Sequence, residues 1–115
     1  MKKTFVAALL ALLSLTFVEA KQRKAEDPVL QFNENGKFKI VQFTDTHLGY
    51  NNRPVYDKSV EMITSIVKTE KPDLVIFTGD IVTGAPMKQG LDNLFAPLDE
   101  MGVPFMLLLG NHDRE

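Results

Sequence analysis

Three apolar runs, each followed directly by acidic, amide or histidine side chains, constrain the fold of this chain more than any other feature. The runs with their polar ends are 38–47, 74–80 and 105–113. Short apolar runs that stop at turn residues are typical of strands buried on both faces, as in parallel sheets. The sequence therefore predicts strands over 38–44, 74–78 and 105–109.

The segments between these runs have helical patterns. In 55–70, apolar residues recur at helical spacing and Pro72 follows as a stop. A second helical pattern covers about 91–101, where Pro97 is expected to kink or divide the helix. Strands that alternate with helices predict right-handed βαβ units, an α/β fold and a parallel sheet.

A β-hairpin is predicted before the first main strand. Apolar and polar residues alternate in 29–32 and again from Lys37, on either side of Asn35-Gly36. Asn-Gly accepts the positive φ angles of a tight hairpin turn. The first hairpin strand is expected at a sheet edge, and 45–54 and 79–90 are expected to be loops.

The N-terminus predicts export. A basic start, an apolar run over 5–18 and the residues Val18-Glu19-Ala20 have the layout of a secretory signal cleaved after Ala20. A membrane anchor is the alternative, but the run is shorter than the roughly 20 residues that a spanning helix needs. We therefore expect a signal peptide over 1–20, a linker over 21–28, one domain over 29–115, and a periplasmic or extracellular location.

Composition excludes several classes of function. The chain has no cysteine, which rules out disulfides, zinc–thiolate sites and a thiol nucleophile. The net charge of -2 implies no strong attraction to nucleic acid.

The polar residues after the three strands should meet in space, because the carboxyl ends of parallel strands share one edge where such sheets bind ligands. Their oxygen and imidazole donors suit divalent Mn, Fe or Zn, and a carboxylate can bridge two ions. Each motif alone also has an ordinary explanation as a turn or a solvated loop. The coincidence of all three at one edge favours a site built from Asp45, His47, Asp80, Asn111, His112 and Asp113.

Together, the motifs Asp45-x-His47, Gly79-Asp80 and Gly110-Asn111-His112-Asp113 resemble the calcineurin-like metallophosphoesterase superfamily. The surrounding residues, over 28–115, resemble its bacterial and fungal branch related to purple acid phosphatases. The resemblance implies a two-sheet α/β/β/α sandwich, of which this chain is the first half. It also implies hydrolysis of phosphate esters by a dinuclear centre with a metal-bound hydroxide as nucleophile.

The same resemblance implies roles for single residues. Asp45 and His47 would bind the first ion, Asp80 would bridge both ions, and Asn111 would bind the second. His112 would stabilise the transition state or protonate the leaving oxygen, and Asp113 would orient His112.

The chain departs from the family pattern in two ways. Thr83 stands where purple acid phosphatases have a tyrosine ligand, so a colourless Mn, Zn or Fe(II) site is expected. The family's later histidine ligands are absent, since His47 and His112 are the only histidines. We therefore expect an N-terminal portion of an enzyme, inactive as residues 21–115 alone. Two alternatives stay open: a complete, secreted module that binds a metal or phosphate without turnover, and a nucleotide-binding fold, which the absence of a Gly-rich loop disfavours.

Overall fold

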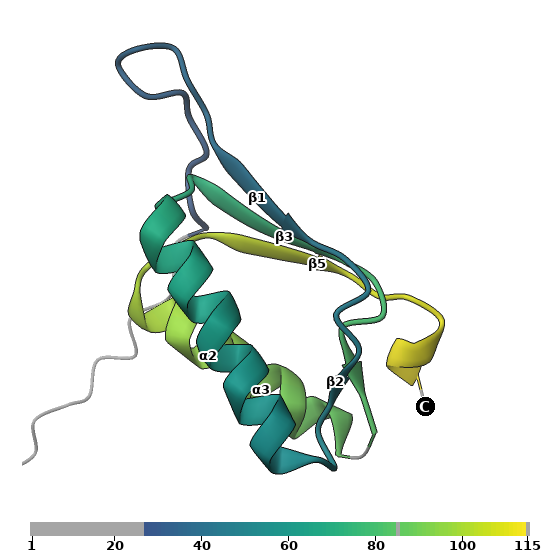
Figure 1. Cartoon of the computed structure of the whole chain (residues 1–115). Helices are drawn as coiled ribbons and strands as arrows, with labels where there is room; N and C mark the ends of the chain where they lie inside the picture. The colour runs from purple at the N-terminus through teal and green to yellow at the C-terminus, as the bar shows by residue number, and fades with distance from the viewer. Residues whose placement is uncertain (1–26, 85, 115) are drawn as a thin grey trace, which may run out of the picture.

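A computed structural model describes residues 27–84 and 86–114. The predicted signal peptide and most of the predicted linker lie outside this range. The described part is built on a three-stranded parallel sheet with the order β1-β3-β5 (Figure 1). Its strands are β1 (Ile40–Phe43), β3 (Leu74–Thr78) and β5 (Phe105–Leu108). The predicted α/β fold with a parallel sheet is confirmed.

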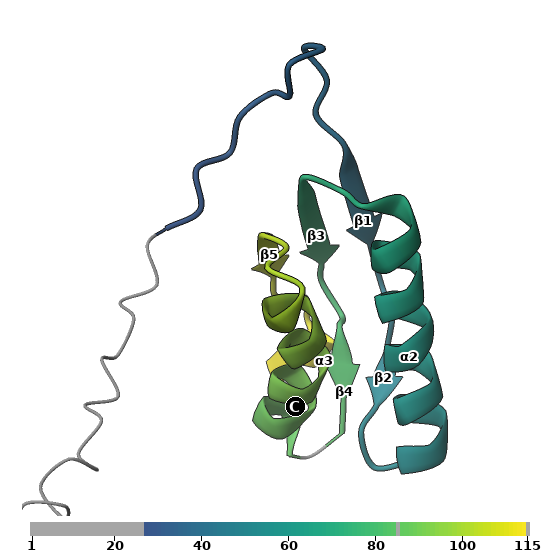
Figure 2. The same ribbon diagram turned by 90° about the vertical axis from the view of Figure 1, so that its left-hand side faces the viewer.

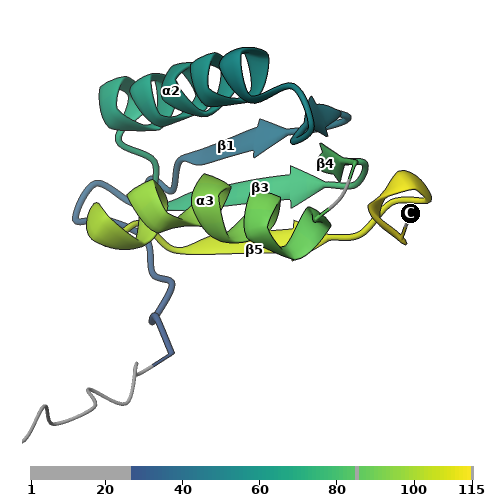
Figure 3. The same ribbon diagram turned by 90° about the horizontal axis from the view of Figure 1, so that it is seen from below.

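Two helices, α2 (Arg53–Glu70) and α3 (Met87–Glu100), connect the three strands. Both lie on the same face of the sheet (Figures 1 and 3). Right-handed crossovers that progress in one direction across a sheet require this arrangement. Neither of these helices has the length and apolar character needed to cross a membrane.

The first helix follows the sequence prediction closely. Pro54 lies in its first turn, where a missing N–H costs nothing, and Lys71 closes it in the left-handed conformation, with its N–H bonded to the Val67 carbonyl. The second helix begins earlier than predicted and continues through Pro97 to Glu100. The expected division is therefore wrong, because Pro97 lies in the final turn, where few further backbone bonds depend on it.

The core lies between the helices and the sheet. Val75 and Phe77 of β3 are fully buried, as are Val67 of α2 and Leu98 of α3. Aromatic contacts extend this packing to the neighbouring strand β1, since the Phe77 ring stacks on the Phe43 ring with 5.3 Å between their centroids. Alternate residues of the central strand thus hold both helices in place.

The opposite face of the sheet is apolar and open to solvent. Ile40, Met106 and Leu108 are 51%, 53% and 61% exposed, and no described helix covers them (Figure 1). Exposed apolar faces of this kind usually mark a surface that another element or partner covers.

Hydrogen bonding between the first two strands continues beyond their ends. Asp45 N–H donates to the Gly79 carbonyl at 3.1 Å and His47 N–H donates to the Asp80 carbonyl at 2.9 Å. The pairing then resumes as a small parallel sheet of β2 (Leu48–Gly49) and β4 (Val82–Thr83). The two predicted loops therefore contain paired backbone, which restricts the directions of the side chains between the sheets.

The predicted hairpin is reduced to its turn. Asn33 N–H donates to the Lys37 carbonyl at 2.9 Å, and Gly36 has the positive φ of 67° that the turn requires. Residues 29–32 form no strand, and this segment extends away from the sheet (Figure 2). An Asn-Gly turn can form locally, whereas the strand before it needs a sheet edge to pair with.

Tyr56 couples the two helices in a way that alkaline pH should reveal. Its ring is 1% exposed and its hydroxyl donates to the Gly90 carbonyl, and burial raises its pKa to about 12. Because the folded pKa exceeds the ordinary value of about 10, the stabilisation is complete below pH 10 and is lost as the pH rises toward 12. We expect Tyr56→Phe to lose less stability than the wild type over this interval, as measured by urea unfolding at each pH. Parallel curves for the two proteins would contradict this coupling.

Candidate metal centre

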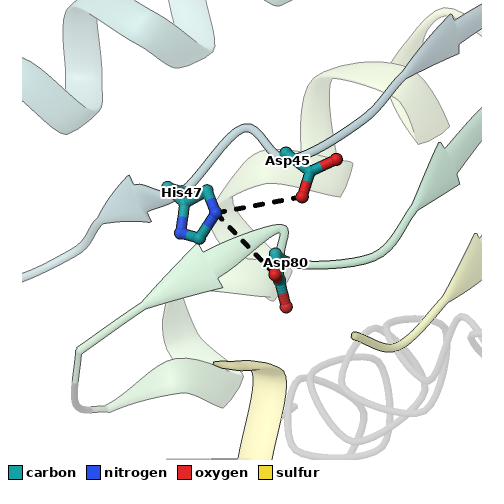
Figure 4. A group of neighbouring side chains, drawn as sticks. All are labelled: Asp45, His47 and Asp80. Atoms are coloured by element: carbon teal, nitrogen blue, oxygen red, sulfur yellow. Dashed lines mark ion pairs between the residues drawn. The ribbon is translucent and has the colours of Figure 1, made fainter. Parts of the chain in front are cut away.

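Asp45, His47 and Asp80 converge where β1 and β3 end (Figure 4). The His47 Nε2 atom lies 4.0 Å from Asp45 Oδ1 and 3.8 Å from Asp80 Oδ2. Oxygen and nitrogen bind first-row ions at about 2.0–2.2 Å, so two ligands of one ion lie at most about 4.4 Å apart. Both of these separations meet that limit, while the set of three donor atoms lies within 4.8 Å, so a small rotation of one carboxylate would bring all three atoms to one ion. The residues therefore fit one divalent ion.

The backbone at these three residues is strained. Asp45, His47 and Asp80 have φ angles of 51°, 43° and 49°, in the left-handed region that side chains disfavour. The only other described non-glycine residue with positive φ is Lys71, which caps α2. Strain of this kind clusters at functional sites. Here it turns the three side chains toward one point while the two strands stay hydrogen-bonded.

Gly110 allows the third motif to approach Asp80. A Cβ atom at Gly110 would lie 2.2 Å from Asp80 Oδ1 and 2.5 Å from Asp80 N. Gly79 has a positive φ of 86°, which lets the backbone turn sharply before Asp80, whereas Gly110 lacks a positive φ and is required because any side chain would collide with Asp80.

His112 and Asn111 lie at the same sheet edge. His112 begins the 3-10 helix η2 (His112–Arg114), and its backbone N–H donates to Asp80 Oδ1 at 2.9 Å. The rings of His112 and His47 are 5.4 Å apart between centroids. Asn111 is exposed and stands between Gly110 and His112. The structure thus brings all three predicted motifs together, while metal binding by Asn111 and catalysis by His112 stay predictions.

Asp113 ties two segments of the site together through their backbones. This carboxylate is 1% exposed. Its Oδ1 atom accepts hydrogen bonds from Ile81 N at 2.7 Å and Val82 N at 3.3 Å, and Oδ2 accepts one from Gly110 N at 2.7 Å. These contacts fix the segment after Asp80 against the turn that carries Asn111. The orientation of His112 by Asp113 stays a prediction.

Sequence reasoning missed Thr44. Its hydroxyl lies 2.5 Å from Asp45 Oδ2 and donates to it. The available signal was a hydroxyl residue directly before the candidate ligand Asp45. Because Thr44 follows an apolar run, however, the sequence predicts only that it ends the strand.

The fold and site define a parallel α/β protein with a candidate carboxylate–histidine metal centre at the carboxyl edge of its sheet. The chain belongs to the calcineurin-like phosphoesterase family, whose model matches residues 38–115. The resemblance inferred from the three motifs is therefore confirmed.

The curated relatives come from plants, yeast and bacteria. "Probable inactive purple acid phosphatase 14" of Arabidopsis thaliana is 33% identical over 75% of this chain and 26% of its own length. "Phosphatase DCR2" of Saccharomyces cerevisiae is 31% identical over 91% of this chain and 21% of its own length. "Uncharacterized metallophosphoesterase YkuE" of Bacillus subtilis is 36% identical over 67% of this chain and 27% of its own length. The chain thus spans about a quarter of the length of these relatives.

Proposed function

We propose that this chain carries part of the active site of an exported enzyme that hydrolyses phosphate esters with two divalent metal ions. The observation that carries the proposal is the convergence of Asp45, His47 and Asp80 within 4.8 Å at the edge of a parallel sheet, in a phosphoesterase family. A relative named as a phosphatase supports a phosphate ester as the substrate. The apolar run near the N-terminus supports export.

In this proposal Asp45, His47 and Asp80 would hold one ion, and Asp80 and Asn111 would contribute ligands to a second ion. The bound ions would polarise the phosphate and lower the pKa of a coordinated water so that it supplies the hydroxide nucleophile. His112 lies beside His47 and contributes a proton donor or a positive charge near the leaving oxygen.

We also propose that the rest of the site comes from a further part of the same protein. Two features support this: the chain contains two histidines, and one sheet face exposes Ile40, Met106 and Leu108 to solvent. A second layer over that face would bury these side chains and bring additional ligands to the carboxyl edge.

A test uses the full-length protein recovered from its host. Chelation with EDTA followed by gel filtration should lower the hydrolysis of p-nitrophenyl phosphate at least about 100-fold, because bound ions supply several kcal/mol of transition-state stabilisation. Adding Mn²⁺ or Zn²⁺ should restore the rate. Residues 21–115 alone should show no turnover under the same conditions. Full activity after chelation would contradict a metal-dependent mechanism.

The second candidate is a module that binds a metal or phosphate without turnover. Relatives whose printed names call them probable inactive purple acid phosphatases favour it. The same experiment separates the candidates, since such a module would bind Mn²⁺ with no release of p-nitrophenol under any metal condition.

A further inference from the structure

The two carboxylates of the metal centre are each held by one oxygen and present the other. Asp80 accepts a backbone hydrogen bond at Oδ1 and turns Oδ2 toward His47. Asp45 accepts a hydrogen bond from Thr44 at Oδ2 and turns Oδ1 toward His47. His47 therefore meets one free oxygen from each carboxylate.

The two carboxylates differ in what restricts their rotation. Asp80 is almost fully buried, so the surrounding backbone restricts its rotamer. The side chain of Asp45 is 63% exposed, and water would let it rotate freely. Thr44 is the described side chain that bonds to it. The hydrogen bond from Thr44 is thus the one that the described residues give to the Asp45 side chain, whereas packing of the fold holds Asp80.

Thr44 is itself well placed for this task. It directly follows β1, and its hydroxyl lies 3.3 Å from the Thr78 carbonyl at the end of β3. Thr78 in turn bonds to the neighbouring backbone at the Phe43 carbonyl, 3.4 Å away. A β-branched side chain has a stiff χ1 angle. A hydroxyl carries one proton, and Asp45 Oδ2 is both the nearer acceptor and the charged one.

We propose that Thr44 is a positioning residue, which holds Asp45 so that Oδ1 faces the ion shared with His47 and Asp80. This inference rests on the proposed function, because it assumes that the centre binds metal. Hydrogen bonds to ligating carboxylates raise metal affinity by orienting the ligand before the ion arrives, and their loss costs about 10–100-fold.

The test compares three variants of the full-length protein after removal of metal. Thr44→Val keeps the shape and removes the hydroxyl, whereas Thr44→Ser keeps the hydroxyl. Thr46→Val is the matched control, because it removes a hydroxyl from the same segment that bonds to the Ile81 carbonyl at 2.9 Å and not to Asp45. Mn²⁺ affinity is measured by competition with a chelating dye, and the melting temperature is measured without metal.

We expect Thr44→Val to weaken Mn²⁺ binding about 10-fold or more, while Thr44→Ser and Thr46→Val bind like the wild type. The metal-free melting temperature of Thr44→Val should not change, since Thr44 is exposed. Equal affinity of Thr44→Val and the wild type, or failure of serine to restore binding, would overturn the inference. The readouts separate the two claims: Mn²⁺ affinity decides the role of Thr44, and phosphate release by the wild type decides the proposed activity.

Discussion

Replacing Asp80 with asparagine should remove both metal binding and hydrolysis in the full-length protein. Asparagine has the same shape and can still accept the hydrogen bond from His112 N at its amide oxygen. It places a neutral amide nitrogen where Oδ2 faces His47, so the carboxylate charge at the centre is lost. We expect Mn²⁺ affinity to fall at least about 100-fold and turnover about 10³-fold, the equivalent of several kcal/mol of metal-derived stabilisation.

Asp99→Asn is the matched control for this change, because Asp99 is an exposed carboxylate near the end of α3. It should leave metal affinity and turnover unchanged. The metal-free Asp80→Asn protein should unfold close to the wild type, since the exchange conserves volume. Unaltered Mn²⁺ binding by Asp80→Asn would refute the assignment of Asp80 as a ligand.

The largest loss of stability is expected from Asp113→Ala. The substitution leaves the N–H groups of Ile81, Val82 and Gly110 without the buried carboxylate that accepts their hydrogen bonds. An unsatisfied buried donor costs about 1–3 kcal/mol, so the free energy of unfolding should fall by about 3 kcal/mol or more. Urea unfolding of the metal-free protein measures this, with Asp99→Ala as the control at an exposed site.

Asp113→Asn should fall between the wild type and Asp113→Ala. Its amide oxygen can accept from Ile81 N, but its amide nitrogen would then face the Gly110 N–H, and two donors cannot bond to each other. If Asp113 acted only by orienting His112, both variants would lose activity while keeping the stability of the wild type. That result would contradict the backbone role assigned to Asp113.

The parts of the fold that depend on local pattern were predictable. The sequence predicts the strand Leu74–Thr78 with the bounds that the structure has, since a short apolar run bounded by turn residues is itself typical of a buried strand. The sequence predicts loops where the structure has the two-residue strands Leu48–Gly49 and Val82–Thr83. Two-residue strands have no periodicity of their own, and these form because β1 and β3 bring the following backbones into register.

The candidate site also has features that the sequence predicts and features that it does not. Topology alone placed Asp45, His47 and Asp80 at one edge, because parallel strands end together. The hydrogen-bond partners of Asp113 could not be predicted from the sequence. They are the backbone N–H groups of Ile81 and Val82, which lie more than thirty residues away and which every non-proline residue has. The role of Gly110 was also hidden, because a close approach between segments depends on the tertiary fold.

The left-handed backbone at Asp45, His47 and Asp80 has a consequence for protein engineering. A redesign that ranks positions by conformational cost would choose these residues for glycine, because glycine adopts positive φ without a steric penalty. Such a protein would lack the three side chains that we propose as metal ligands. Selection for a high melting temperature alone would therefore favour variants that have lost these three side chains. Screens of this chain should measure metal binding as well as the melting temperature.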